Sequence, residues 1–80
     1  MNGTVPLKPT KVRILAKVLA KLGFNLERIH GSHLIFKHAD GRITVVPRHG
    51  NQEIGRGLLR SIAADVRMSP DELAQLIDEV

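Results

Sequence analysis

Histidines and cations gather in residues 31–50, where their types could support proton transfer on a phosphodiester. This stretch contains His33, His38 and His49 together with Lys37 and Arg48. An imidazole titrates near neutral pH, so it can take a proton from a ribose 2′-hydroxyl or give one to a leaving oxygen. Cations beside it would stabilise the charge that develops on the phosphoryl oxygens. RNA is the natural substrate for this chemistry, because DNA lacks the internal nucleophile.

Other catalytic chemistries are poorly supported by the sequence. The chain has no cysteine, and Ser32 is the strand neighbour of His33, so the two side chains point to opposite faces and cannot form a nucleophile–base pair. No phosphate-binding glycine loop is present. A metal site would have to use the four histidines without a carboxylate or thiolate, and His38 is expected on the other face from His33. We therefore expect neither a metal nor a cofactor. One alternative stays open: the turn after Arg48 could bring His49 toward His33, to form an acid/base pair or the start of a metal site.

A β-hairpin is predicted to position these side chains. Asp40-Gly41 favours a two-residue turn between two runs rich in β-branched and aromatic residues. Counting outward from that turn places His33 opposite Arg48 and Lys37 opposite Thr44. One face of the hairpin then carries core residues, and the other carries a candidate site. The expected core residues are Leu34, Phe36, Ile43 and Val45, and the expected site residues are His33, Lys37, Thr44 and Arg48.

Helices are predicted before and after a three-stranded antiparallel meander, in the chain order helix, three strands, helix, helix. A first helix is expected to be capped by Thr10 and to end at Gly23, and residues 24–30 form the first strand, with a bulge or a differently directed Ile29. Gly31-Ser32 allows a tight reversal into the hairpin. A second helix is expected over residues 55–67, with Leu58, Leu59, Ile62, Ala63 and Val66 buried. Ser69-Pro70-Asp71-Glu72 predicts a capping box that starts a third helix. The pattern indicates an α+β fold.

The chain is expected to form one domain over residues 10–80, preceded by a flexible arm over residues 1–9 that contains Gly3, Pro6 and Pro9. Its 80 residues leave room for a small core and no deep enclosed pocket. No apolar run is long enough to span a bilayer, and the N-terminus lacks the apolar segment of a signal peptide. We expect a cytoplasmic protein without a membrane partner.

Charge is distributed unevenly along the chain. The first 60 residues hold eleven of the twelve Lys and Arg side chains, whereas the last 20 are net acidic. A basic body suits a polyanion such as RNA, although a merely soluble basic surface explains the charge equally well. The only aromatic residues are Phe24 and Phe36, and Phe36 is expected in the core. Recognition is therefore expected to depend on the nucleic-acid backbone and its shape rather than on base stacking.

From the residues alone, His33 is most simply an exposed strand histidine, and a family resemblance changes that interpretation. The motifs on which the resemblance rests are Leu22-Gly23-Phe24, Gly31-Ser32-His33, His38-Ala39-Asp40-Gly41, Val45-Val46-Pro47-Arg48-His49, residues 54–57 and Leu59-Arg60-Ser61-Ile62. In order and spacing, residues 11–70 resemble the HicA mRNA interferase toxins of bacterial and archaeal toxin–antitoxin pairs. Many members carry a second histidine directly after the first, where this chain has Leu34.

The resemblance implies a fold similar to the double-stranded-RNA-binding domain (dsRBD), here with an extra short C-terminal helix. It also implies that His33 is catalytic and that a HicB-like antitoxin covers the site. The expected function is that of the toxin of a type II toxin–antitoxin pair, a metal-independent endoribonuclease that cleaves mRNA by histidine acid/base catalysis. Lys37 and Arg48, with the neighbouring Ser32 and His49, are the expected RNA contacts. A non-catalytic RNA-binding module of the same fold stays open as the alternative.

Overall fold

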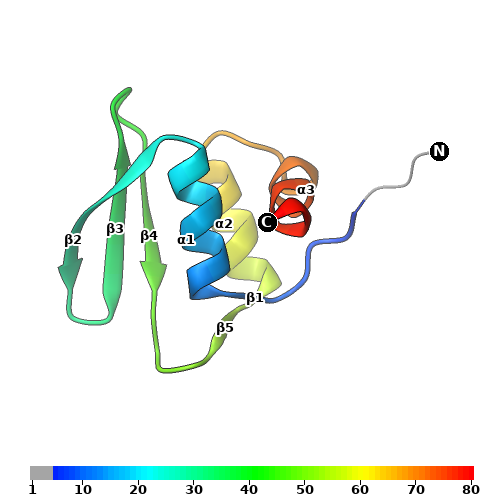
Figure 1. Cartoon of the computed structure of the whole chain (residues 1–80), viewed down its shortest axis with the longest axis horizontal. Coiled ribbons are helices and arrows are strands. Elements are labelled where there is room, and N and C mark those ends of the chain that lie inside the picture. The colour runs from blue at the N-terminus through cyan, green and yellow to red at the C-terminus, as the bar shows by residue number, and fades with distance from the viewer. Residues whose placement is uncertain (1–4) are drawn as a thin grey trace.

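The computed structural model describes residues 5–80 and confirms an α+β fold (Figure 1). One helix is followed by a three-stranded antiparallel sheet and then by two more helices, and two very short strands pair with each other beside the first two helices. In chain order the elements are β1 (Thr10–Lys11), α1 (Val12–Lys21), β2 (Phe24–His30), β3 (His33–His38), β4 (Ile43–Pro47), β5 (Glu53–Ile54), α2 (Arg56–Asp65) and α3 (Pro70–Glu79).

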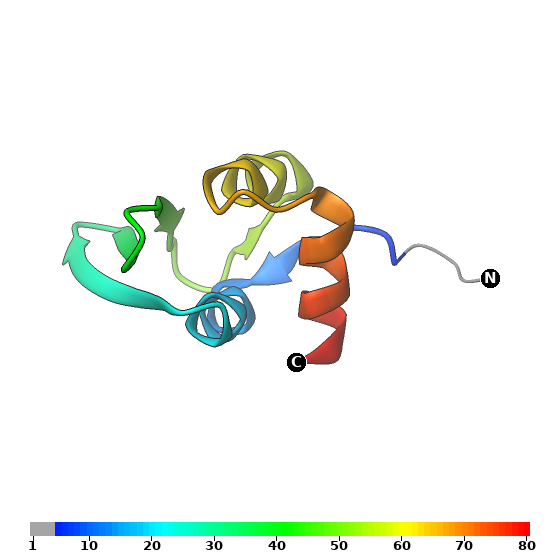
Figure 2. The same cartoon turned by 90° about the horizontal axis from the view of Figure 1, so that it is seen from above.

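The elements form three layers, which Figure 2 shows from above. The sheet, in the predicted meander order β2-β3-β4, is the first layer, and α1 and α2 lie side by side against one of its faces. Helix α3 lies across the other side of the helix pair and contacts both helices. The arrangement of sheet and helix pair is consistent with the expected dsRBD-like fold. The opposite face of the sheet is left open, and this open face carries part of the candidate site.

Helix α1 packs through Leu15, Val18 and Leu19, which are fully buried, and it ends where the sequence predicts. Gly23 follows the C-cap residue with a φ of 92°, and a Cβ at this position would lie 2.9 Å from Nε2 of His38. The glycine is therefore required both by the turn and by the close approach of His38.

The predicted N-cap of this helix was wrong. Lys11 occupies the N-cap position without a side-chain hydrogen bond. Thr10 pairs instead with Ile54 in the β1–β5 ladder, and its hydroxyl donates to the carbonyl of Lys8 at 2.8 Å. The sequence pattern did not predict this short ladder, which ties the start of α1 to the start of α2.

Helix α2 is shorter than the predicted 55–67, and Leu58 is 38% exposed rather than buried. The remainder of the predicted stripe, Leu59, Ile62, Ala63 and Val66, is buried as expected. For α3 the capping box is confirmed: Glu72 N donates to Ser69 Oγ, and Ser69 N donates to Glu72 Oε1. The hydrogen bond from the Ser69 backbone N–H, and then that from its side chain, hold the pKa of the Glu72 carboxyl below its usual value.

Strand β2 has the predicted bounds, and the alternative of a bulge is confirmed between Leu26 and Arg28. The bulge resets the alternation, so that Ile29 becomes the partner of Leu34 and shares its face of the sheet. The Gly31-Ser32 reversal is also confirmed. Gly31 has a φ of 61°, and the two residues connect His30 to His33 directly.

The predicted register of the β3–β4 hairpin was wrong by one residue. Its loop has three residues, Ala39, Asp40 and Gly41, closed by hydrogen bonds from Gly41 N to His38 O and from His38 N to Arg42 O, both 2.9 Å. A two-residue turn would need a positive φ at Asp40, but only Gly41 adopts one, at 98°. His33 therefore pairs with Pro47, and Phe36 with Thr44.

This shift exchanges the faces of β4. Thr44 and Val46 are buried beneath the helices, at 1% and 0% exposure. Ile43 and Val45, which were expected in the core, lie on the open face at 49% and 39%. Thr44 tolerates burial because its Oγ1 donates to Oδ2 of Asp65 in α2 at 3.0 Å.

The N-terminal arm expected over residues 1–9 falls partly outside the described residues, since these begin at residue 5, and it stays a prediction. Residues 5–9 form no helix or strand, and Leu7 packs against the core. Among the helices of residues 5–80, none is long and apolar enough to cross a membrane.

Candidate functional site

His33 begins β3 and is exposed on the open face of the sheet. The next residue, Leu34, is buried against the helices, so strand alternation directs His33 away from them. Its neighbours on the two adjacent strands are His30 of β2 and Pro47 of β4. The predicted catalytic residue is therefore accessible to a large substrate, and it lies at the end of the sheet where the β2–β3 turn reverses the chain (Figure 1).

His30 is the cross-strand partner of His33, and the sequence interpretation did not include it in an acid/base site. The two residues flank the Gly31-Ser32 turn and are paired directly, so their Cβ atoms lie about 5 Å apart on one face. Both side chains are exposed. The signal was present in the spacing His-Gly-Ser-His, since a two-residue turn always makes its flanking residues partners. Two imidazoles can thus reach one phosphodiester group.

Lys37 shares the open face with His33, as predicted, but it lies four residues along the same strand. At about 3.3 Å per residue the separation is about 13 Å, with Ile35 between the two residues. Lys37 and His33 are therefore too far apart to contact one phosphate group of a bound strand.

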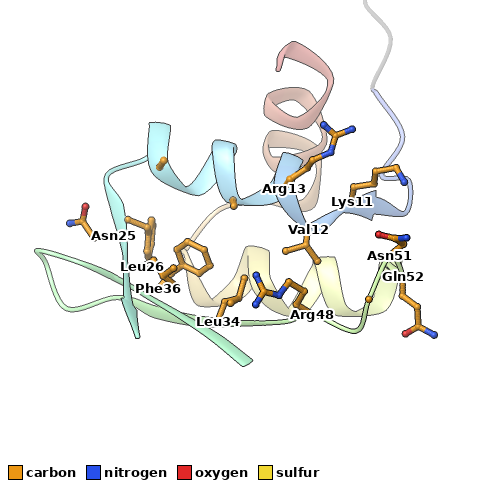
Figure 3. Close-up of a pocket in the computed structure, with 14 residues that line it drawn as sticks. Lys11, Val12, Arg13, Asn25, Leu26, Leu34, Phe36, Arg48, Asn51 and Gln52 are labelled. Carbon is orange, nitrogen blue, oxygen red and sulfur yellow. The ribbon is translucent and has the colours of Figure 1, made fainter. Parts of the chain in front are cut away.

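The prediction that Arg48 lies directly across the ladder from His33 was wrong, as was the placement of Thr44 on the same face. Because the hairpin register differs by one residue, Arg48 lies beyond the end of β4, where its backbone N–H donates to the carbonyl of Ser32 at 2.7 Å. Its side chain lines a groove on the helix side of the sheet, next to Leu34 (Figure 3). Thr44 is buried and bonded to Asp65.

The two remaining predicted RNA contacts lie close to this end of the sheet. Ser32 is half-buried in the β2–β3 turn and is tied to Arg48 through the backbone. His49 is exposed in the segment between β4 and β5. Of the predicted site, then, the structure brings His33, Ser32 and the backbone of Arg48 to one corner, and it separates Lys37 and Thr44 from them.

The contacts of His38 indicate that it supports the fold rather than the site. The backbone N–H of Asp40 donates to its Nδ1 at 3.1 Å, and its ring packs edge-on against Phe24 with centroids 5.1 Å apart. By register it lies on the helix side, away from His33. Across the described part of the chain, residues 5–80, no three His, Cys, Asp or Glu side chains come together in a group that could hold a metal ion.

Positive charge gathers at the end of the molecule that carries the histidine pair. Figure 1 shows that α1 and α2 both begin at the end of the molecule that carries the β2–β3 turn, close to β1 and β5. Neither helix has an acidic residue in its first turn, so the partial positive charge of each N-terminus is not neutralised locally. Lys11, Arg13, Arg48 and Arg56 add full charges there, against the single carboxylate of Glu53, which is the cross-strand partner of Lys11. An anionic backbone passing His33 would meet a positive surface.

Comparison with known proteins gives one family. Residues 12–68 match the family model described as the HicA toxin of bacterial toxin–antitoxin systems. The match runs from the first residue of α1 to Met68, two residues before α3 begins. No curated protein matched the chain significantly.

The matched segment includes the whole three-stranded sheet, both helices packed on it, and the predicted site residues from His30 to His49. It spans well over half of the 80 residues. The chain therefore belongs to the HicA toxin family of bacterial toxin–antitoxin systems.

Proposed function

We propose that this chain is an endoribonuclease toxin that cleaves mRNA by acid/base catalysis at His33 and His30. The pairing of these two exposed histidines across the β2–β3 turn carries the proposal. Membership of the HicA toxin family supports it independently.

Cleavage needs two proton transfers, and two imidazoles can divide them. One neutral imidazole takes the proton of the ribose 2′-hydroxyl, whose oxygen then attacks the phosphorus atom. The bond from phosphorus to the 5′-oxygen breaks, and the second imidazole, in its protonated form, donates a proton to that leaving oxygen. The positive end of the molecule stabilises the charge on the phosphoryl oxygens. The chemistry needs no metal ion, and the nucleophile belongs to the RNA.

A HicB-like antitoxin is the proposed protein partner, and the open face suits it. Ile43 and Val45 leave an apolar strip on this face beside Ile35, on the same strands that carry His33 and Pro47. Apolar surface exposed next to a charged site is typical of a protein interface. A partner seated there would cover the histidine pair.

The test compares the purified wild-type chain with His33→Ala and with the matched variant His49→Ala, using single-stranded RNA. His33 is exposed and buries little apolar area, so His33→Ala should lose less than about 1 kcal/mol of stability. It should bind RNA and fail to cleave it, whereas His49→Ala, which alters a predicted RNA contact, should bind RNA less tightly and still cleave it. Full cleavage by folded His33→Ala would refute the assignment. RNA binding without cleavage by the wild type would favour the non-catalytic RNA-binding module instead.

A further inference from the structure

A groove separates α1 from the sheet on the helix side, and it is distinct from the face that carries His33. It encloses about 620 Å³, which is in the range of small-ligand pockets. Figure 3 shows Leu34 and Phe36 along the sheet side and Val12 on the helix side. Ala16 and Ala20 also line the helix side, and their short side chains keep the groove open along about 12 Å of α1.

The two ends of the groove differ in chemistry. At one end Leu26 is 48% exposed, although β2 directs it toward the helix side beside Phe36. Three cations from separate parts of the chain line the other end: Lys11 and Arg13 at the start of α1, and Arg48 in the segment after β4. No carboxylate is among the lining residues within the described part of the chain.

The remaining polar lining groups are side-chain amides. Asn51 and Gln52 lie at the cationic end, whereas Asn25 borders the apolar end with its amide directed toward the open face, as its strand partner Lys37 is. The amides at the cationic end can donate hydrogen bonds to a phosphate or a ribose. A cationic end without acids selects an anion, and an apolar end suits a flat heterocycle.

We propose that this groove binds one unpaired nucleotide of the RNA, with its base at the Leu26 end and its phosphate at the Lys11–Arg13–Arg48 end. The inference rests on the proposed ribonuclease function. Arg48 connects the groove to the site, because its backbone N–H is bonded to Ser32, the residue before His33. A strand that leaves the cationic end therefore continues past the turn that carries His30 and His33.

A nucleotide held in this groove would set the position of cleavage. The groove lies at a fixed distance from the histidine pair, since both are built on β3 and its turns. The base in the groove would then be read at a constant number of nucleotides from the broken bond. This gives sequence preference to a protein whose two phenylalanines, at 3% and 4% exposure, offer no open ring for stacking.

The experiment uses two groove variants and two matched controls. Ala20→Leu fills the groove at an exposed helical position, and Ala64→Leu makes the same change at an exposed position of α2 outside it. Arg13→Gln removes one groove cation, and Lys17→Gln removes an exposed charge from the same helix outside the groove. All four positions are exposed, and thermal unfolding checks that each variant folds.

Two measurements use RNA: the affinity for short single-stranded RNA, and the positions at which a mixed-sequence RNA is cleaved. A third follows the NMR chemical shifts of the residues that line the groove during titration with nucleoside 5′-monophosphates. Ala20→Leu and Arg13→Gln should weaken RNA binding by about fivefold or more, the loss expected for contacts to one base, and should alter the cleavage map. Ala64→Leu and Lys17→Gln should behave like the wild type.

The failure of this proposal differs from failure of the proposed function. If the wild type cleaves RNA and the groove variants match their controls in affinity and cleavage map, the groove proposal is wrong and the histidine site stands. If the groove variants lose affinity only for an antitoxin protein, the groove is a protein-docking site and the nucleotide proposal is wrong. If the wild type binds no RNA, both proposals fall together.

Discussion

At the scale of single residues, the proposed cleavage of RNA depends on His30 and His33 acting on the same phosphodiester. Their pairing follows from a two-residue turn that needs Gly31 at a φ of 61°. A side chain at that position would be strained, so the glycine supports the site although it takes no part in the chemistry.

The pH dependence of cleavage tests this division of roles. Because one imidazole must be neutral and the other protonated, the wild-type rate should rise and then fall with pH. His30→Ala should lose one limb of this profile and slow cleavage by about a hundredfold or more, while RNA affinity changes little. A His30→Ala protein that keeps both limbs and the wild-type rate would leave His33 as the only imidazole in the mechanism.

At the scale of elements, periodicity and turn signals predicted the three helices and the three-stranded sheet, but not the N-cap of α1, the β1–β5 ladder or the hairpin register. Asp40-Gly41 is compatible with loops of two and of three residues, and the choice between them depends on the φ of Asp40. The apolar pattern favoured the wrong choice, since Ile43 and Val45 are more hydrophobic than Thr44. Burial of Thr44 depends on Asp65, 21 residues further along the chain, and no local pattern encodes that contact.

Lysine substitutions distinguish the two registers. Thr44→Lys should destabilise the fold by about 3 kcal/mol or more, because it forces a charge into a site that is 1% exposed. Val45→Lys, at the neighbouring open-face position, should change stability by less than about 1 kcal/mol. Urea unfolding of both variants checks this, and the reverse order of stabilities would restore the register predicted from the turn.

The hairpin loop is also held by charge. Arg42 Nε donates to both carboxylate oxygens of Asp40, at 2.8 and 3.1 Å, and its Nη1 donates to the carbonyl of Val66 after α2. The backbone N–H of Arg42 also donates to Oδ1 of Asp40. The side-chain hydrogen bonds from Arg42, and next the backbone bond, lower the pKa of the Asp40 carboxyl below the ordinary 3.8. The Asp40 carboxylate thus holds Arg42 in the position from which Arg42 bonds to Val66, and this connects the hairpin loop to the helix layer.

Stability should depend on pH through this carboxylate. A carboxyl whose pKa is lower in the folded state than in the unfolded state stabilises the fold above its unfolded pKa, and the contribution is lost as pH falls through the folded pKa. Asp40→Asn should therefore be less stable than the wild type at pH 7, and the difference should shrink at acid pH below 3.8. A difference that stays constant down to strongly acid pH would show that Asp40 acts without its charge.

At the scale of the whole molecule, acidic side chains are concentrated in α3, on the side of the helix pair away from the sheet. The histidine pair, the starts of α1 and α2 and the groove cations share one end, whereas the acidic α3 covers the helix layer on the side away from the sheet. RNA should therefore approach the turn end of the sheet. Antitoxin binding to the apolar strip of the open face would then compete with RNA for the same corner.

Salt dependence measures how many phosphates the molecule contacts. Lys37→Gln should reduce the slope of log affinity against log salt by about 0.7, the value for one lost contact to a single strand. Lys21→Gln, at the far end of α1, should leave the slope unchanged. Equal slopes for the wild type and Lys37→Gln would place the RNA backbone away from the far part of the open face.

The central claim is that the RNA supplies its own nucleophile and that histidines move the protons. The most direct measurement is cleavage of one RNA oligomer and of the same oligomer with a single 2′-deoxyribose at the mapped cleavage position, using metal-stripped protein in excess chelator. The intact RNA should be cut to a 2′,3′-cyclic phosphate end, and the deoxy-substituted RNA should not be cut there. Cleavage of both oligomers, or activity that returns only when a metal ion is added, would contradict the account.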